Sequence, residues 1–288
     1  MSQADKFYRF IFEEHDIRGE LVCLSNSYQD AIRSRAYPEQ VRALLGECLA
    51  ASVLLSGTLK FDGILSIQAK GNGPVSLMMA ECTHYRTVRA VAQWSEDAQP
   101  GSGELPDLVS QIGEGHMAIT IDPEKGQRYQ GIVPLVEGGL GSCLESYFQH
   151  SEQLETKLFL FSDQQYAAGL LLQKLPAQKA ADPDAWNRIC HLGSSLTFDE
   201  LKTLSGEQIV HRLYHEEDVR LYPEENIRFE CSCSQQRTEM ALKSLGEREV
   251  YGILEEDNLI EIDCHFCAAK YRFEREQVDR IFQPPTLQ

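Results

Sequence analysis

The stretches Cys231-Ser232-Cys233 and Cys264-His265-Phe266-Cys267 decide how the tail of this 288-residue chain folds. Thirty residues separate them, which is enough chain to fold back and bring the four thiols together. Two close cysteine pairs of this kind are typical of a tetrahedral zinc site, because zinc prefers four soft ligands. Cysteines spaced C-x-C can also bond to each other. The same four residues could therefore form a zinc site or two local disulfides, which suggests a switch.

Zinc would supply much of the stability of this tail. From Cys231 to Gln288 there are 58 residues, and a core of that size rarely supplies more than about 3–5 kcal/mol. Structural zinc adds about 10–16 kcal/mol, whereas a disulfide that closes a loop of three or four residues adds only about 2 kcal/mol. Oxidation of the thiols is therefore expected to eject zinc and unfold the tail. His265 could replace one ligand, although four thiolates already complete the tetrahedron.

Composition and charge limit the class of protein. The net charge is −17, and from Cys231 to Gln288 there are eleven acidic and seven basic residues. A nucleic-acid partner is therefore not expected, because phosphate contacts need a basic surface. No apolar segment follows Met1, and the most apolar run, Leu44 to Leu55, is interrupted by Gly46 and Glu47. We expect a soluble cytoplasmic protein with no membrane partner, whose cysteines are thiols or metal ligands.

The first 176 residues predict an α+β domain with a mostly antiparallel sheet and packed helices. A turn at Arg18-Gly19 is expected between the first two strands. The pattern predicts a helix that is opened by Tyr37-Pro38-Glu39 and runs to about Ser56, and another over Leu144–His150. Gly71-Asn72-Gly73-Pro74 predicts a hairpin turn that joins the strands expected over Ile64–Lys70 and Val75–Cys82. Further strands are expected over Thr87–Trp94, Met117–Ile121, Tyr129–Val133, Lys157–Phe161 and Ala167–Leu175.

Residues 177–226 predict a helical linker that opens with a polar hinge at 177–183. Ile209 with Leu213, and Val210 with Tyr214, form i,i+4 pairs on one apolar stripe. The segment is too charged to build its own core, so this stripe must dock on another surface. Three short helices are expected in the linker, over Asp184–Leu192, Asp199–Leu204 and Glu207–His215.

Residues 227–288 predict a small zinc domain. The second cysteine pair is expected at the turn of a hairpin over Leu259–Phe273, and helices are expected over Gln235–Leu245, Arg248–Glu255 and Arg275–Phe282.

Catalytic motifs are not apparent, and we expect no enzyme. The sequence shows no G-x-S-x-G, phosphate-binding loop or H-E-x-x-H. His211 and His215 are four residues apart on an expected helix and could bind metal, but they more simply flank a solvated face. The five other cysteines are best explained as small buried hydrophobic residues: Cys23, Cys48, Cys82, Cys143 and Cys190.

Segments outside the tail carry a further pattern: Gln68–Pro74, Gly126–Leu135, Tyr147–Gln153 and Ala168–Gln173. Together with the two cysteine pairs, these segments make the whole chain resemble the bacterial 33 kDa chaperonin family, the redox-regulated heat-shock holdases. The resemblance implies an ATP-independent chaperone that binds unfolding proteins in the cytoplasm under oxidative stress and prevents their aggregation.

The resemblance also implies how the four cysteines act. In the reduced, inactive state, one Zn²⁺ would be held by the thiolates of Cys231, Cys233, Cys264 and Cys267. Peroxide with heat, or hypochlorous acid, would join Cys231 to Cys233 and Cys264 to Cys267. Zinc would leave, the tail and linker would unfold, and the oxidised protein would dimerise and bind unfolded client proteins.

Two alternatives remain. A zinc-stabilised module could read nucleic acid or a protein partner, although the acidic tail argues against nucleic acid. Cys264-x-x-Cys267 could instead serve a thiol oxidoreductase, but that motif usually lies at a helix N-terminus, and here a hairpin turn is expected.

Overall fold

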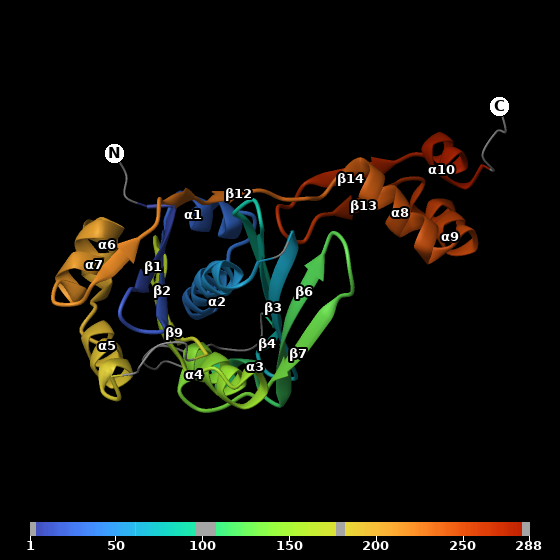
Figure 1. The fold of residues 1–288 in the computed structure, drawn as a ribbon. Coiled ribbons are helices and arrows are strands. Elements are labelled where there is room, and N and C mark those ends of the chain that lie inside the picture. Colours follow the sequence, from blue (N-terminus) through green and yellow to red (C-terminus); the bar gives the residue numbers. More distant parts are fainter. Residues whose placement is uncertain (1–3, 61, 96–107, 177–181, 284–288) are drawn as a thin grey trace. The chain divides into compact units, whose positions relative to one another are not determined.

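The structure is a computed structural model that describes residues 4–60, 62–95, 108–176 and 182–283. The chain divides into two compact units, with the boundary between Glu230 and Cys231 (Figure 1). The α+β class expected from the sequence is confirmed, with helices packed on largely antiparallel sheets. Most of the expected hinge at 177–183 lies outside the described residues.

One sheet, which we call sheet A, joins the beginning of the first unit to its end. Its described strands follow the order β10-β1-β2-β9-β8, and β11 also pairs with β1. All these neighbours are antiparallel. The strands are β1 (Lys6–Phe12), β2 (Ile17–Leu24), β8 (Thr156–Ser162), β9 (Ala167–Lys174), β10 (Val219–Leu221) and β11 (Glu225–Asn226).

The turn expected at Arg18-Gly19 is wrong. Both residues lie inside β2, where Gly19 pairs with Phe10 of β1. A Cβ atom on Gly19 would lie 2.1 Å from the Phe10 ring. Glycine is therefore required at this position because an aromatic ring covers the backbone. In the sequence alone, such a glycine cannot be distinguished from one that signals a turn.

A second sheet, sheet B, faces sheet A across a helix. Its order is β12-β5-β4-β3-β6-β7, with β12 parallel to β5 and the other neighbours antiparallel. The expected hairpin at Gly71–Pro74 is confirmed, and a Cβ on Gly73 would lie 2.5 Å from the Gln111 carbonyl oxygen. The strands are β3 (Gly63–Gly71), β4 (Val75–Thr83), β5 (Thr87–Trp94), β6 (Gly115–Pro123), β7 (Tyr129–Val133) and β12 (Arg228–Phe229).

Helix α2 (Glu39–Thr58) lies between the two sheets and forms the centre of the main core (Figure 1). Among the described residues it is long and apolar enough to cross a membrane, and 78% of its apolar window is buried inside the protein. The expected interruption of the apolar run at Gly46 and Glu47 therefore does not make the helix too short or too polar to cross a membrane. Because most of its apolar window is buried inside the protein, α2 is a core helix. The remaining helices of this core are α1 (Asn26–Ile32), α3 (Leu108–Ile112), α4 (Gly139–Tyr147) and the π-helix η1 (Phe148–Glu152).

Three short helices cover the other side of sheet A, which we call its outer face. They are α5 (Ala185–Gly193), α6 (Phe198–Thr203) and α7 (Gly206–Tyr214). Capping boxes begin α6 and α7, at Thr197 and Ser205. The Tyr214 ring of α7 lies 5.9 Å from the Phe10 ring and 5.0 Å from the Phe12 ring, centroid to centroid. The apolar stripe of the expected linker thus docks on the outer face of sheet A.

The tail unit has a core of its own. The expected hairpin and helices are confirmed as α8 (Gln235–Leu245), α9 (Glu247–Asp257), β13 (Ile260–Asp263), β14 (Lys270–Phe273) and α10 (Arg275–Phe282). Its buried hydrophobic side chains within residues 231–283 are Leu242, Val250, Leu254, Ile260, Phe273, Val278 and Ile281.

Candidate metal centre

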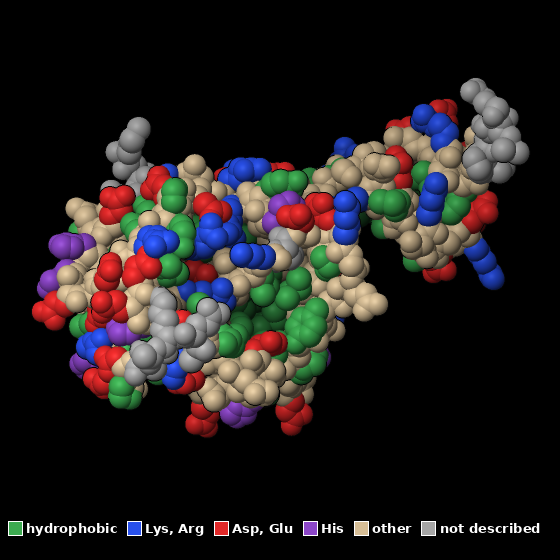
Figure 2. Space-filling model, viewed as in Figure 1, with side chains coloured by type: hydrophobic (Ala, Val, Ile, Leu, Met, Phe, Trp, Pro, Cys, Tyr) green, Lys and Arg blue, Asp and Glu red, His purple; other side chains and the backbone are tan. Residues whose placement is uncertain are grey.

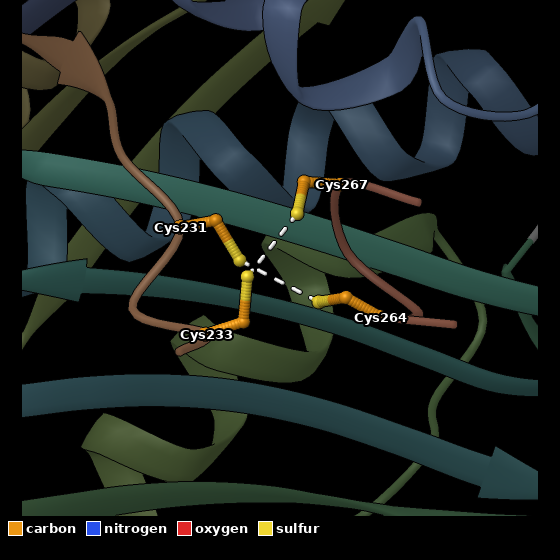
Figure 3. A group of neighbouring side chains, drawn as sticks. All are labelled: Cys231, Cys233, Cys264 and Cys267. Atoms are coloured by element: carbon orange, nitrogen blue, oxygen red, sulfur yellow. Dashed lines mark hydrogen bonds between the residues drawn. The ribbon is translucent and has the colours of Figure 1, made fainter. Parts of the chain in front are cut away.

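Two loops of the tail unit bring the four expected cysteines together (Figure 3). Cys231 and Cys233 lie in the extended segment before α8. Cys264 and Cys267 lie in the turn between β13 and β14. The four side chains point toward a common centre, with two sulfurs contributed by each loop. All four residues are half-buried, so the cluster is shielded from bulk water but can be reached by small molecules.

The distances fit a tetrahedral metal site. The four Sγ atoms all lie within 4.8 Å of one another. Cys231 Sγ lies 3.6 Å from Cys264 Sγ, and Cys233 Sγ lies 3.4 Å from Cys267 Sγ. Four sulfurs bound at about 2.3 Å from one central ion would be about 3.8 Å apart. The four cysteines can therefore hold a metal ion, and a set of four soft donors fits a soft or borderline cation.

Backbone hydrogen bonds fix the second loop. Ala268 N–H donates to the Cys264 carbonyl over 2.8 Å, and Cys264 N–H donates to the Ala269 carbonyl over 2.9 Å. Ala268 adopts a left-handed conformation with φ 56°, which closes the turn tightly enough for both thiols to face the same side. The C-x-x-C motif thus lies in a hairpin turn rather than at a helix N-terminus. This position disfavours the oxidoreductase alternative, because a helix N-terminus is what lowers the thiol pKa in such enzymes.

The first loop is fixed by the start of α8. The Ser234 side chain caps this helix and accepts a hydrogen bond from Arg237 N–H over 3.2 Å. The Arg237 Nη1 atom donates to Ser232 Oγ, between the two cysteines, over 2.7 Å. Polar residues in the first turn of α8 and at its N-cap therefore hold the C-x-C segment in place.

The ionisation of the cluster is uneven. Burial raises the pKa of the Cys231 thiol, and it raises the pKa of the Cys267 thiol to about 12. Burial also opposes ionisation of Cys233, but hydrogen bonds from Tyr271 and the neighbouring thiols outweigh it and lower the pKa of Cys233. Four clustered thiolates repel one another, so a cation between them is what allows all four to be ionised together.

Sequence reasoning missed Tyr271. Its hydroxyl hydrogen-bonds to Cys233, which raises the pKa of Tyr271 to about 12. Tyr271 lies in β14, four residues after Cys267. The sequence indicates this residue only indirectly, because the second strand of the expected hairpin passes close to the cysteines. Within the described residues, the group that could hold a metal contains the four cysteines and does not include His265.

The other cysteines are separate from this cluster. Cys23, Cys48, Cys82 and Cys143 are buried, which confirms their interpretation as small hydrophobic residues, and Cys190 is half-buried. Burial raises the pKa values of the Cys23, Cys48 and Cys190 thiols to about 12. Such thiols are poor nucleophiles at neutral pH, whereas the tail contains Cys233, whose pKa is lowered.

Comparison with known proteins agrees with this arrangement. A sequence model of the Hsp33 protein family matches residues 5–274. The chain is 47% identical to the 33 kDa chaperonin of Hahella chejuensis, over 99% of each chain. It is 45% identical to the 33 kDa chaperonin of Pseudomonas aeruginosa strain PAO1, over 98% of this chain and 96% of that one.

The fold is also similar to that of a solved structure. A crystal structure of the 33 kDa chaperonin from Thermotoga maritima superposes with a TM-score of 0.83 and 21% identity, covering 96% of this chain and 97% of that one. With a family match over residues 5–274 and relatives at 45–47% identity along nearly the whole chain, this protein belongs to the Hsp33 protein family.

Proposed function

We propose that this protein is a redox-regulated, ATP-independent holdase that binds unfolding proteins under oxidative stress and is inactive when reduced and zinc-bound. Family membership and relatives named 33 kDa chaperonin support a chaperone role. The observation that carries the proposal is the clustering of four thiols within 4.8 Å in a unit with a small core. Such a unit depends on its thiols for stability.

The proposed ligands are Cys231, Cys233, Cys264 and Cys267. Zn²⁺, when bound, would supply about 10–16 kcal/mol of folding free energy and keep the four sulfurs ionised. The seven buried hydrophobic side chains of the described tail belong to a core that supplies about 3–5 kcal/mol at this size. Loss of the thiolates would therefore remove most of the stability of the tail unit.

Oxidation removes these ligands. In the proposed step, Cys231 bonds to Cys233 and Cys264 bonds to Cys267. Each pair of thiolates loses two electrons to one molecule of hydrogen peroxide, which takes up two protons from the solvent and is reduced to two molecules of water, while the Zn²⁺ ion is released to the solvent. Each new bridge closes a loop of three or four residues and restores only about 2 kcal/mol. The oxidised tail is therefore expected to unfold.

The helices α5, α6 and α7 would respond next. They are joined to the tail through β10, β11 and β12, which lie on the edges of both sheets. We infer that an unfolded tail destabilises these edge strands and that the three helices then leave the outer face of sheet A. Their departure would uncover Tyr8, Phe10, Phe12, Leu21, Leu170 and Leu172, all of which are buried.

A surface of this kind can bind non-native proteins. Contiguous exposed apolar side chains bind other apolar segments without sequence preference, and the net charge of −17 would keep the opened protein soluble. The proposed partners are unfolded or misfolded client proteins and a second copy of the oxidised chain, in the cytoplasm. The net charge of −17, with acidic side chains on both units of the face that Figure 2 shows, supports neither a nucleic-acid partner nor an anionic membrane partner.

Light scattering from a chemically unfolded client, diluted into buffer, tests the proposal. Reduced, zinc-loaded protein is compared with protein oxidised by peroxide at elevated temperature, and with oxidised protein treated with a reductant. Suppression of scattering only by the oxidised sample, reversed by the reductant, is expected. Equal suppression by all three samples would contradict the switch, and no suppression by any of them would contradict the chaperone function.

A further inference from the structure

Two histidines at the end of α7 have no part in the proposed switch: His211 lies in the last turn of the helix, and His215 caps its C-terminus. His211 and His215 are both exposed, and their ring centroids are 5.9 Å apart. The sequence between them, His211-Arg-Leu-Tyr-His215, has the i,i+4 spacing of zinc-peptidase helices without the glutamate that serves as base there. The pair therefore offers two metal ligands on one helix face but no hydrolytic chemistry.

The geometry is close to that of a chelate. Residues four apart on a helix have Cβ atoms about 5–6 Å apart. With metal–nitrogen bonds of about 2.1 Å, two imidazoles on one ion have ring centroids about 5 Å apart. The observed separation of 5.9 Å closes to that value by a small rotation of exposed side chains. No change in the helix backbone is required.

Neighbouring charges favour a cation. Arg212 lies between the histidines in sequence, but its Nε atom pairs with Glu200 over 2.6 Å and its Nη1 atom donates to Ser195 Oγ over 2.9 Å. The last turn of α7 carries the negative end of the helix dipole. Four acidic residues also lie on or just after the helix: Glu207, Glu216, Glu217, which pairs with Arg188, and Asp218.

We propose that His211 and His215 form a second metal site, which takes a divalent transition-metal ion of the kind that imidazole prefers, such as Zn²⁺, Ni²⁺ or Cu²⁺. The remaining coordination positions are filled by water. This site is independent of the four cysteines in the tail unit and lies on a helix that covers the outer face of sheet A.

A metal held by both histidines stabilises α7, because the bidentate site exists only while residues 211–215 are helical. A ligand at ten times its dissociation constant lowers the open population of its site about 11-fold. Within the proposed function, the bound ion therefore opposes the departure of α7, so raised free zinc or copper would delay activation. This consequence rests on the proposed function, whereas the metal site itself does not.

Titration calorimetry with Ni²⁺ tests the site. Untagged, reduced, zinc-loaded protein is titrated while a chromogenic chelator reports any zinc displaced from the cysteines. One Ni²⁺ is expected to bind per chain, and His211→Gln and His215→Gln are each expected to weaken binding at least tenfold. His191→Gln is the matched control, because His191 is exposed on α5 and lies outside the pair. Equal Ni²⁺ binding by all four proteins, or no binding by the parent, would overturn the proposal.

Hydrogen exchange then measures the effect on α7. With Ni²⁺ at ten times its dissociation constant, amides of residues 206–214 are expected to exchange about tenfold more slowly in the parent and at an unchanged rate in His215→Gln. Binding without this protection would leave a metal site and overturn its effect on the helix. Neither measurement uses chaperone activity, so a failure here is distinguishable from a failure of the proposed function.

Discussion

The Nε atom of Arg86 lies 2.8 Å from Glu225 Oε2, and this ion pair joins the loop before β5 of sheet B to β11 at the edge of sheet A. Arg9 Nη2 lies 2.9 Å from the other oxygen of Glu225. The preceding residue, Glu224, accepts hydrogen bonds from Lys6 and Tyr8. Two adjacent carboxylates thus fasten the segment that runs from α7 to the first cysteine.

Loss of this ion pair should lower the threshold for activation. Glu225→Gln removes the charge that faces both Arg86 and Arg9, and we expect it to destabilise the segment by about 1–3 kcal/mol. Faster hydrogen exchange of residues 219–229, and peroxide activation at a lower temperature, would report the change. The control is Glu230→Gln, whose pair with Arg228 is exposed on both sides and should be worth less than about 1 kcal/mol. If both variants behave alike, the fastening role of Glu225 is wrong.

The four thiols should be needed together. Cys233→Ser leaves three sulfurs and one weak oxygen donor, so we expect substoichiometric zinc and an unfolded tail in reduced protein. Zinc content and the thermal unfolding of residues 231–283 measure this. Cys190→Ser, outside the cluster and half-buried, should retain one zinc per chain. Full zinc occupancy in Cys233→Ser would argue against a four-thiolate site.

The pairing of the oxidised cysteines can be distinguished by what each alternative does to the tail. The closest sulfurs belong to different loops, Cys231 with Cys264 and Cys233 with Cys267. Bonds between those pairs would tie the loops together and keep the tail closed, whereas bonds within each motif release them. We expect peptide mapping after peroxide treatment to find Cys231–Cys233 and Cys264–Cys267. Predominant cross-loop bonds with full chaperone activity would exclude unfolding through local disulfides.

Tyr214 should hold α7 on the outer face of sheet A. Its ring is 1% exposed and packs on Phe10 and Phe12. Tyr214→Ala leaves a large cavity and should cost about 3–5 kcal/mol. The helices should then undock while the tail stays folded, which gives client binding without oxidation and one zinc per chain. Glu207→Ala, an exposed change on the same helix, should leave reduced protein inactive. If reduced Tyr214→Ala is inactive although the amides of α7 exchange rapidly, then uncovering the outer face of sheet A is not sufficient for client binding.

Some features of the fold could be predicted because the residues that specify them are close in sequence. The cysteine spacing specifies the tail cluster, and the stretch Gly71–Pro74 specifies a hairpin, since both depend on a few adjacent residues. The apolar stripe of α7 likewise shows which side is buried. It does not show what covers that side, because any apolar surface satisfies the same pattern.

Other features depend on contacts between distant residues. The strands β10, β11 and β12 span two or three residues each. Segments this short show no hydrophobic periodicity, and they become strands because they pair with strands of the two sheets. Arg86 and Glu225 are 139 residues apart, and no local sequence pattern near either residue predicts their ion pair. Gly19 resembles a turn residue for the same reason, since the Phe10 ring that requires a glycine there belongs to another strand.

The carboxyl group of Glu20 should make stability depend on pH. Glu20 is 2% exposed, and among the described residues its Oε2 atom has no hydrogen-bond partner. Burial raises its pKa to about 8, from an ordinary value of 4.5, although the nearby cations Arg18, Arg86 and Arg9 act in the opposite direction. Between these two pKa values, the folded protein keeps a proton that the unfolded chain has lost.

Because the pKa is raised on folding, stability is lost as pH rises from about 4.5 to about 8, at up to about 1.4 kcal/mol per pH unit. Glu20→Gln mimics the protonated side chain and should remove this contribution. Urea unfolding at pH 6 and pH 8 measures this contribution. The free energy of unfolding of Glu20→Gln, relative to that of the parent, should be higher at pH 8 than at pH 6. The exposed change Glu207→Gln should keep the parent's pH dependence. If the difference between Glu20→Gln and the parent is the same at both pH values, Glu20 ionises normally and its burial carries no cost.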